Sequence, residues 1–466
     1  MRTSLAILFC FLLFFASAQE WRTLNDVDLN QADIWTLDVI GDSLYIGGPI
    51  GTVNGELTIG SFIWDSSAAH IYTPGLFEIG SGAYAKGHLL FGDTLILHGR
   101  FDHVNQLPQT RGITQMKNGV WGTIGGSCTG GTDQVVSAIV WEGELYASHG
   151  YSGIGDLTDV YSFTKWNGVE WVELETVLGS TVSPIEMCLF NGQLWGGGDF
   201  EVTTNGETVH NVAFFDGMHW QDPNGGMSGR IQALYPDEEE GRLYVAGNGS
   251  LAQYGDVSCP NNICYWDGAN WHPVGEFNDI NYDITAIAKY RGQLYVGGYF
   301  ELNGQAEKLA YFDGVHWQPV PDAGVIDEWV RCLQVYKNEL YVAGSFPDIA
   351  DLGTTSVARY YLHPDSVVWA VPDTTVNVLE KIPSGKAELK VYPNPSKGEI
   401  TVHFGFMTDR QLAILDSNGK TLLQSSPGIR ESENINLNNL SGGQYFCVLL
   451  TDGAEPTAVH SFIIEK

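Results

Sequence analysis

The sequence predicts an all-β chain in which a repeat array, residues 19–372, is followed by a smaller β-domain, residues 387–466. Three observations lead to this prediction. A similar unit returns seven times, the 56 glycines and 12% aromatic residues suit short strands joined by tight turns, and the pattern changes after Lys386. A chain of 466 residues is also too long for one ordinary core.

The N-terminus, MRTSLAILFCFLLFFASAQE, has the order of a secretory signal peptide. Arg2 supplies the positive end, an apolar run extends from Leu5 to Phe15, and Ala16-Ser17-Ala18 is a small-residue cleavage site. The alternative, a membrane anchor, needs roughly 20 apolar residues, and this run is shorter. We therefore expect residues 1–18 to be removed, leaving a mature chain that has no transmembrane segment.

The repeat is defined by a Leu within a β-rich run such as LYVGG. The spacings between successive anchors are 51, 50, 49, 49, 51 and 46 residues. The anchors are Leu44, Leu95, Leu145, Leu194, Leu243, Leu294 and Leu340. A period near fifty indicates a β-propeller or a similar array, and seven anchors predict seven blades.

Each unit is expected to form four antiparallel strands. In the sixth unit, ITAIAKY and QLYVGGYF flank a tight turn at Arg291-Gly292, and LAYF and VHWQPV flank Asp313-Gly314. Asp-Gly between two β-rich runs is typical of a type I′ hairpin, in which both central residues have positive φ. The same signal recurs as Asn118-Gly119, Asn167-Gly168, Asp216-Gly217 and Asp267-Gly268.

Four-stranded sheets cannot bury both faces alone, so they are expected to stack radially on their neighbours. Recurrent last-strand tryptophans would fill the interfaces: Trp121, Trp171, Trp220, Trp271, Trp317 and Trp369. Gly47-Gly48 and Gly297-Gly298 are expected where the backbone bends or passes close to another group. Trp21 also lies at last-strand spacing from Leu44, so a strand at Trp21 or one at Trp369 is expected to complete the final blade.

An apolar run ending in Gly-Gly, followed by a Tyr and then a Trp, resembles the pattern of the Kelch family of β-propellers. Gly297-Gly298, Tyr311 and Trp317 carry this resemblance, which covers roughly residues 21–372. The pair departs from the family pattern at His98-Gly99 and Ala246-Gly247. The resemblance implies a Kelch-like seven-bladed β-propeller.

Residues 387–466 follow a linker, residues 373–386, and their strand-like runs around Asn-Gly and Gly-Gly turns predict a small Ig-like β-sandwich. They closely resemble the type A C-terminal sorting domain of the type IX secretion system. The matching residues are Tyr392, Pro393, Asn394, Pro395, Gly398, Asp416, Gly419, Leu440, Gly443, Tyr445 and Lys466. The resemblance implies the type IX machinery as a partner, and export through the periplasm to the outer surface of a Gram-negative bacterium or into the medium.

The charge is concentrated in the repeat array. Residues 19–386 hold 46 acidic and 16 basic side chains, a net charge of −30. This acidity excludes nucleic acid as a natural partner and disfavours anionic membranes. The acidic loops at residues 236–241 and 321–327 are candidates for calcium, the alternative being solvated surface charge; no other metal or cofactor is predicted.

Few residues suggest chemistry. Cys259 and Cys264, in CPNNIC, are a candidate loop disulfide in an oxidising compartment. GxSxG, HExxH and P-loop motifs are missing from the sequence, and no catalytic residue is predicted. The leading hypothesis is a non-catalytic secreted or surface-held module that binds an extracellular protein or glycan. The alternatives are a glycan hydrolase or lyase with acidic residues at the channel mouth, and a purely structural surface-layer component.

Overall fold

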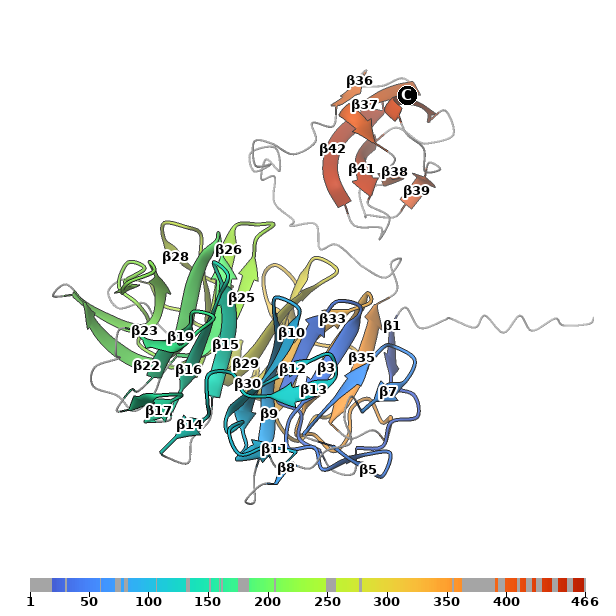
Figure 1. Cartoon of the computed structure of the whole chain (residues 1–466). Coiled ribbons are helices and arrows are strands. Elements are labelled where there is room, and N and C mark those ends of the chain that lie inside the picture. Colours follow the sequence, from blue (N-terminus) through green and yellow to red (C-terminus); the bar gives the residue numbers. More distant parts are fainter. Residues whose placement is uncertain are drawn as a thin grey trace, which may run out of the picture. The chain divides into compact units, whose positions relative to one another are not determined.

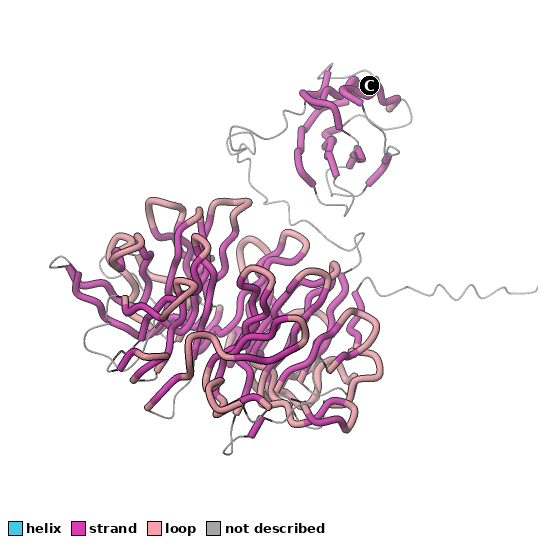
Figure 2. The backbone as a smooth tube through the Cα atoms, in the orientation of Figure 1, coloured by secondary structure: helices cyan, strands magenta, loops and turns pink. Residues whose placement is uncertain are grey.

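The computed structural model covers the whole chain and divides it into two compact units, residues 1–363 and 364–466. The residues it describes are 19–29, 32–58, 60–71, 77–78, 83–105, 107–130, 135–150, 152–158, 160, 162–174, 184–204, 207–248, 257–275, 279–353, 356–362, 390–392, 399–408, 411–415, 421–424, 430–437, 443–450 and 456–464. These residues form strands, turns and loops without a helix, which confirms the all-β prediction (Figure 2). The predicted signal peptide, residues 1–18, lies outside the described residues.

The described residues of the first unit form seven four-stranded antiparallel sheets, which we number along the chain. Sheet 1 comprises β2 (Thr36–Ile40), β3 (Ser43–Gly47), β6 (Ser61–Trp64) and β7 (Ala69–His70). Sheet 2 comprises β9 (Tyr84–Phe91), β10 (Thr94–Arg100), β12 (Ile113–Lys117) and β13 (Val120–Gly122). Sheet 3 comprises β15 (Val135–Trp141), β16 (Glu144–His149), β19 (Ser162–Trp166) and β20 (Trp171–Glu173).

Sheet 4 comprises β21 (Pro184–Phe190), β22 (Gln193–Thr204), β23 (Glu207–Phe215) and β24 (Trp220–Gln221). Sheet 5 comprises β25 (Ile231–Asp237), β26 (Arg242–Gly247), β27 (Ile263–Trp266) and β28 (Trp271–Pro273). Sheet 6 comprises β29 (Ile280–Tyr290), β30 (Gln293–Leu302), β31 (Gln305–Phe312) and β32 (Trp317–Pro319). Sheet 7 comprises β33 (Val330–Tyr336), β34 (Glu339–Gly344), β35 (Val357–Leu362) and β1 (Gln19–Arg22).

Short strands in the loops also pair. They are β4 (Thr52–Val53) with β5 (Glu56–Leu57), β8 (Phe77–Glu78) with β11 (His103–Val104), and β14 (Cys128–Thr129) with β17 (Gly153–Ile154) and β18 (Leu157–Thr158).

The first strand of each large sheet contacts the first strand of the next, in the cyclic order β2, β9, β15, β21, β25, β29, β33 and back to β2. The sheets therefore follow one another around a closed ring, with their first strands innermost (Figure 1).

The N-terminal strand completes the last sheet. Strand β1 pairs with β35 in the register Trp21↔Tyr360 and takes the outer position of sheet 7. The two ends of the ring thus share one sheet, so opening the ring requires breaking its hydrogen bonds. The competing candidate, Trp369, lies outside the described residues.

Between neighbouring sheets the core is filled by large apolar side chains, as the repeat predicted. One cluster joins Trp195 of sheet 4 to Trp266 and Trp271 of sheet 5, and comparable clusters join sheets 2 and 3, 3 and 4, 5 and 6, and 7 and 1. The indole N–H of Trp271 donates at 2.7 Å to the carbonyl oxygen of Pro223, in the loop between sheets 4 and 5. Equivalent bonds join Trp171 to Ile124 and Trp21 to Pro321.

Steric contacts explain why glycine is needed at the second position of the Gly47-Gly48 and Gly297-Gly298 pairs. A Cβ on Gly298 would collide with the carbonyl oxygen of Asp283 in the neighbouring strand β29, and one on Gly48 would collide with that of Asp33. The close approach predicted from sequence is therefore made by the backbone of the innermost strand, where it bends into the ring.

The predicted type I′ geometry is correct at Asn118-Gly119, where φ is 52° and 76°. It is wrong at the four other Asp-Gly and Asn-Gly turns. In sheet 4, Phe215 pairs with Trp220, so the central residues are Gly217 and Met218, and of these two only Gly217 has positive φ, 98°, as in a type II′ turn.

The cause of this shift is a side-chain cap. The Asp216 carboxylate accepts the backbone N–H groups of Met218 and His219 at 2.8 and 2.7 Å, which places the Asp before the turn instead of inside it. The same double acceptance occurs at Asn167, Asp267 and Asp313.

Cys259 and Cys264 form a disulfide at the start of strand β27, and both side chains are buried. The bridge closes a loop with a sequence separation of five residues.

The Cys259→Ala/Cys264→Ala variant should lose about 2 kcal/mol of unfolding free energy, which is the contribution expected from the loop-closure entropy of so short a loop. Urea unfolding with and without reductant measures this loss. Equal midpoints for the oxidised protein and the variant would contradict it.

The second unit has two antiparallel sheets among its described residues. One contains β36 (Lys390–Tyr392), β37 (Glu399–Thr408) and β40 (Arg430–Asn436). The other contains β39 (Thr421–Gln424), β38 (Gln411–Leu415), β41 (Gly443–Leu450) and β42 (Pro456–Ile464). Val402 of the first sheet and Ile414 of the second are both buried, so each sheet turns one apolar face inward.

Candidate functional site

A cavity of about 710 Å³ lies where the seven innermost strands meet. Every one of these strands contributes to its wall. The contributing segments are 35–38, 86–88, 136–138, 186–187, 232–234, 285–287 and 331–333, with His98, Gly150 and Arg230 added from neighbouring positions. The cavity is therefore the centre of the ring, a place that no local sequence motif marks.

A β-bulge recurs in the innermost strands and aims side chains at this cavity. The register shifts by one residue in six of the seven strands, and the extra residues are Lys86, Val136, Ile185, Gln232, Thr285 and Arg331. In sheet 1, Trp35 holds the corresponding place before Thr36, which pairs with Gly47. A bulge bends its strand and re-aims the extra residue. Five of the extra residues, Lys86, Val136, Gln232, Thr285 and Arg331, line the cavity.

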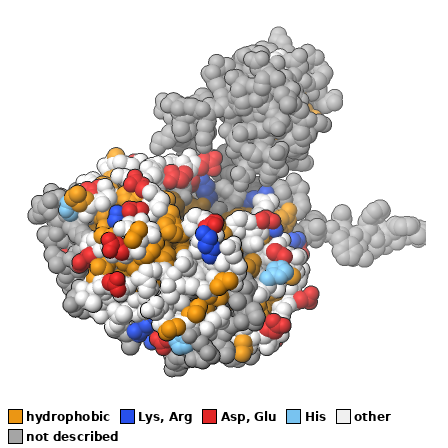
Figure 3. Space-filling view, viewed as in Figure 1, with side chains coloured by type: hydrophobic (Ala, Val, Ile, Leu, Met, Phe, Trp, Pro, Cys, Tyr) orange, Lys and Arg blue, Asp and Glu red, His pale blue; other side chains and the backbone are white. Residues whose placement is uncertain are grey.

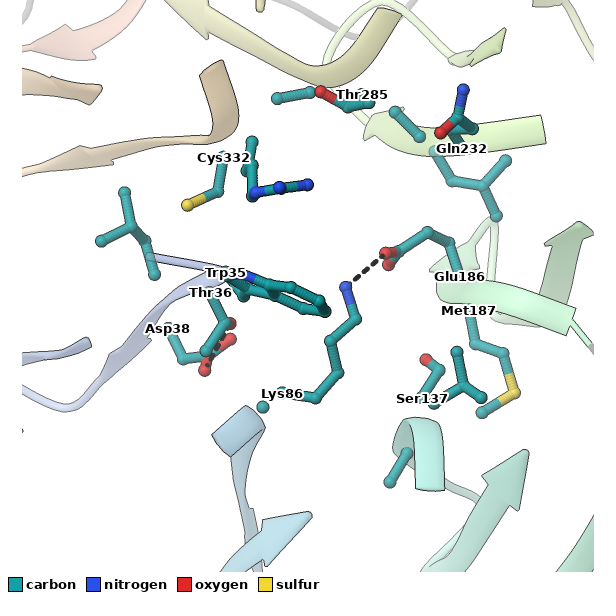
Figure 4. A pocket seen from close by; sticks show the side chains of 18 of the residues that line it. Trp35, Thr36, Asp38, Lys86, Ser137, Glu186, Met187, Gln232, Thr285 and Cys332 are labelled. Atoms are coloured by element: carbon teal, nitrogen blue, oxygen red, sulfur yellow. Dashed lines mark hydrogen bonds and ion pairs between the residues drawn. The ribbon is translucent and has the colours of Figure 1, made fainter. Parts of the chain in front are cut away.

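Lys86 and Glu186 form the central ion pair of the cavity. They extend from strands β9 and β21 toward each other, with 3.7 Å between the Lys86 Nζ and Glu186 Oε1 atoms (Figure 4). Burial raises the pKa of the Glu186 carboxyl, and the neighbouring Lys86 ammonium partly opposes that shift. A carboxyl with a raised pKa at a cavity is a feature of some functional sites and also of structural ion pairs.

Arg331 and Trp35 form one wall of the cavity. The Arg331 guanidinium lies 4.9 Å from the Trp35 ring and 5.5 Å from the Trp329 ring, while its Nε donates to Asp33 at 2.9 Å. Tyr84 contacts Trp35 with 4.3 Å between ring centroids. These contacts join sheets 7, 1 and 2 and hold the guanidinium beside the cavity, where its planar donors suit oxyanions.

A Ser–His–Asp chain lies beside the cavity. Ser61 Oγ is 2.7 Å from His88 Nε2, and His88 Nδ1 is 2.8 Å from Asp38 Oδ2. This order is that of serine hydrolases. Ser61, however, is 1% exposed, does not line the cavity and donates its hydroxyl to the Ile46 carbonyl oxygen at 3.0 Å. The geometry therefore supports a buried link between sheets 1 and 2 and gives no nucleophile facing a substrate.

His98 lines the cavity from the second strand of sheet 2 and is 4% exposed. Burial lowers the pKa of His98 to about 4, so the ring is neutral near pH 7. Its Nδ1 donates to the Val135 carbonyl oxygen of sheet 3 at 3.1 Å. These contacts give His98 a packing role between sheets.

The acidic loop at residues 236–241 binds a lysine of the next sheet. Lys289 Nζ lies 2.7 Å from Asp237 Oδ2 and 2.6 Å from Glu240 Oε1. Burial alone would lower the pKa of Lys289, but the hydrogen bonds to both carboxylates outweigh it and raise that pKa.

Within the described residues, no group of three His, Cys, Asp or Glu side chains is arranged to hold a metal ion. On the face shown in Figure 3, acidic side chains are scattered.

Most residues of the sorting-domain pattern lie outside the described residues. These are Pro393, Asn394, Pro395, Gly398, Asp416, Gly419, Leu440 and Lys466. Tyr392 ends strand β36, Gly443 begins β41, and Tyr445 is a buried residue of β41. The structure thus assigns these three residues to the two sheets of the second unit.

Residues 390–465 match the family model described as the secretion system C-terminal sorting domain. The C-terminal unit is a sorting domain. It directs export through the type IX secretion system, so the chain reaches the cell surface or the medium of a Gram-negative bacterium. Among the described residues, no helix has the length and apolarity to cross a membrane.

Solved structures with similarity to the chain share little sequence with it. A computationally designed protein, Ika8, is 12% identical and matches 73% of this chain and 99% of its own, with a TM-score of 0.42. PorZ, a surface component of the type IX secretion system of Porphyromonas gingivalis, is 13% identical over 93% of this chain and 75% of its own, with a TM-score of 0.23.

A quinonprotein alcohol dehydrogenase-like protein from Bacteroides thetaiotaomicron is 11% identical over 71% of this chain and 68% of its own, with a TM-score of 0.33. No curated protein matches the sequence. Likeness at this level carries no inference about ligand or reaction.

Sequence reasoning missed the cavity residues, although the repeat holds a signal for them. The extra residue of the bulge stands nine positions before the anchor Leu in most units, as Lys86 does before Leu95 and Arg331 before Leu340. Because the residue type changes from unit to unit, the position is visible only after the bulge itself is known.

Proposed function

We propose that residues 19–372 form a Kelch-like β-propeller with seven blades, one for each four-stranded sheet, and that residues 387–466 form an Ig-like sandwich. The cyclic contacts of the innermost strands support the first assignment. Two sheets, each with an inward apolar face, support the second.

We further propose that the propeller, once exported, is a non-catalytic module that binds a glycan or protein ligand in its central cavity. The observation that carries this proposal is the cavity itself. Its volume of about 710 Å³ lies within the range of roughly 300–1,000 Å³ typical of ligand pockets, and dissimilar polar and aromatic side chains from every sheet line it.

A cavity-filling substitution tests this function. The Gln232 side chain lines the cavity and makes no hydrogen bond to any described residue, so Gln232→Trp should fill the space without breaking a side-chain hydrogen bond. We expect the mature chain to bind one class of ligand on a glycan array or in a pull-down, and Gln232→Trp to weaken that binding at least about tenfold.

The matched control is Val169→Trp, which places the same indole at an exposed turn of sheet 3 and should bind as the parent does. Equal binding by the parent and Gln232→Trp, with both folded by circular dichroism, would place the ligand elsewhere and refute the proposal.

One observation favours the glycan hydrolase or lyase alternative. Asp38 and Glu186 bring carboxylates from sheets 1 and 4 to the cavity, and the pKa of Glu186 is raised, as that of a general acid is. If the protein released reducing ends from a bound glycan, and Glu186→Gln abolished this activity, the protein would be a glycan hydrolase or lyase. That result would exclude a non-catalytic binding module.

A further inference from the structure

The charged side chains at the cavity have the opposite net sign to the unit that contains them. Lys86, Arg230 and Arg331 line it together with two carboxylates, Asp38 and Glu186, which gives a formal charge of +1. Residues 19–386 carry −30. A cationic recess in an acidic protein concentrates field lines at one place and favours an anionic group there.

Much of the hydrogen-bonding capacity left unused at this recess is donor capacity, although the Glu186 carboxylate also accepts no hydrogen bond from the described residues. Arg331 uses only Nε in its hydrogen bonds, to Asp33 and Ser345, so both Nη groups are available as far as the described residues go. Among the described residues, the one polar contact of Lys86 Nζ is with Glu186 at 3.7 Å, which is longer than a hydrogen bond. Arg230 is exposed, and its side chain makes neither an ion pair nor a hydrogen bond with the described part of the chain.

One oxygen of the Asp38 carboxylate, in contrast, is already occupied. Its Oδ2 accepts from the Thr36 hydroxyl at 2.8 Å and from the backbone N–H and the ring Nδ1 of His88 at 2.9 and 2.8 Å. Asp38 therefore acts as a structural acceptor within the protein. A ligand that supplies hydrogen-bond acceptors of its own would suit the remaining donors of the recess.

Neutral polar groups stand beside these cations. The Gln232 carboxamide has donors and an acceptor without a partner among the described residues, Ser137 adds a hydroxyl, and Trp35 adds an aromatic wall. Hydroxyl groups and a carboxylate on one small ring would satisfy this set, whereas a peptide terminus would leave the neutral groups unpaired.

We propose that the cavity binds the carboxylate-bearing sugar unit of a glycan. Lys86, Arg230 and Arg331 receive the carboxylate, and Gln232 and Ser137 bond the hydroxyls. This inference rests on the proposed binding function and names its ligand class. Because the surrounding protein is acidic, it repels a uniformly anionic polymer, so a single acidic unit at the end of an otherwise neutral glycan fits best.

Two sugars that differ only at C6, D-glucuronate and D-glucose, test the proposal in titration calorimetry of the mature chain at low ionic strength. We expect glucuronate to bind at least about tenfold more tightly, since charge-assisted hydrogen bonds are the stronger ones. Arg230→Gln should weaken glucuronate binding about tenfold without altering stability, because the Arg230 side chain makes no hydrogen bond or ion pair with a described residue.

Lys117→Gln is the matched control. It removes one positive charge from an exposed side chain that pairs with Asp93 and does not line the cavity, and it should leave glucuronate affinity unchanged. Equal affinity for glucuronate and glucose, or an equal loss in Arg230→Gln and Lys117→Gln, would overturn the inference.

Two further probes separate the sources of an anion. Inorganic sulfate binding as tightly as glucuronate would show an anion site without sugar recognition, and acetyl-dialanine binding more tightly would show a peptide site; either result overturns the sugar assignment. A neutral glycan whose binding is lost in Gln232→Trp would overturn it while leaving the proposed binding function intact. Glucuronate binding retained in Gln232→Trp would refute both.

Discussion

Deletion of residues 387–466 is expected to stop export, leaving the remaining chain folded in the periplasm and absent from the cell surface and the medium. The physical reason is the separation of the chain into two compact units, of which the second is the sorting domain. The β-ladder that closes the ring joins β1 to β35, both within the first unit, so this deletion leaves its hydrogen bonds in place.

Cell fractionation with protease accessibility measures the outcome, and circular dichroism of the retained protein shows whether the ring is folded. The reciprocal control attaches residues 387–466 to a periplasmic carrier protein, which should then leave the cell. Truncated protein found in the medium in parental amounts would show that export does not depend on the sorting domain.

Trp271→Ala is expected to lower the free energy of unfolding by roughly 3–5 kcal/mol, the range for a large aromatic side chain removed from a core. Trp271 is 3% exposed, contacts Trp266 with 5.3 Å between ring centroids, and donates its indole N–H to Pro223. The substitution removes the packing of sheet 5 against sheet 4 and leaves the Pro223 carbonyl without this donor.

Trp271→Phe separates the two contributions, because it keeps most of the ring and loses only the N–H; we expect a smaller loss of about 1–2 kcal/mol. Val169→Ala, at a side chain that is 83% exposed, should change stability by less than about 0.5 kcal/mol. Denaturant unfolding compares the three variants. If Trp271→Ala matched Val169→Ala, Trp271 would be a surface residue and the interface between sheets would need another explanation.

Particular strands and turns show how much of the fold could be predicted from the sequence. The anchor leucines, such as Leu294 in β30, all lie in the second strand of their sheet. Each sheet repeats the same arrangement of strands, so the same buried position returns at a regular spacing along the chain. The tight turn predicted at Arg291-Gly292 is present, and both of its residues have positive φ, 54° and 78°. The turn at Asp216-Gly217 lacks the predicted type I′ geometry, since the Asp side chain bonds to the backbone and moves the turn by one residue.

The candidate site was beyond prediction for a different reason. Lys86 and Glu186 are about a hundred residues apart, and neither belongs to a motif that indicates binding. Their meeting depends on the bulge that carries Lys86 in β9 and on closure of the ring, which brings β9 and β21 to one cavity. The same holds for Ser61, His88 and Asp38, whose hydrogen bonds resemble a catalytic triad although burial removes the hydroxyl from the cavity.

By itself, the sequence determined the repeat, the all-β class and the C-terminal sorting domain, because each depends on residues close together along the chain. Only the tertiary structure decided that β1 completes the last sheet and that cations, an indole and an amide converge on one cavity. The reason is that the cavity-lining residues of each sheet mean little alone and come together only when the ring brings the innermost strands together.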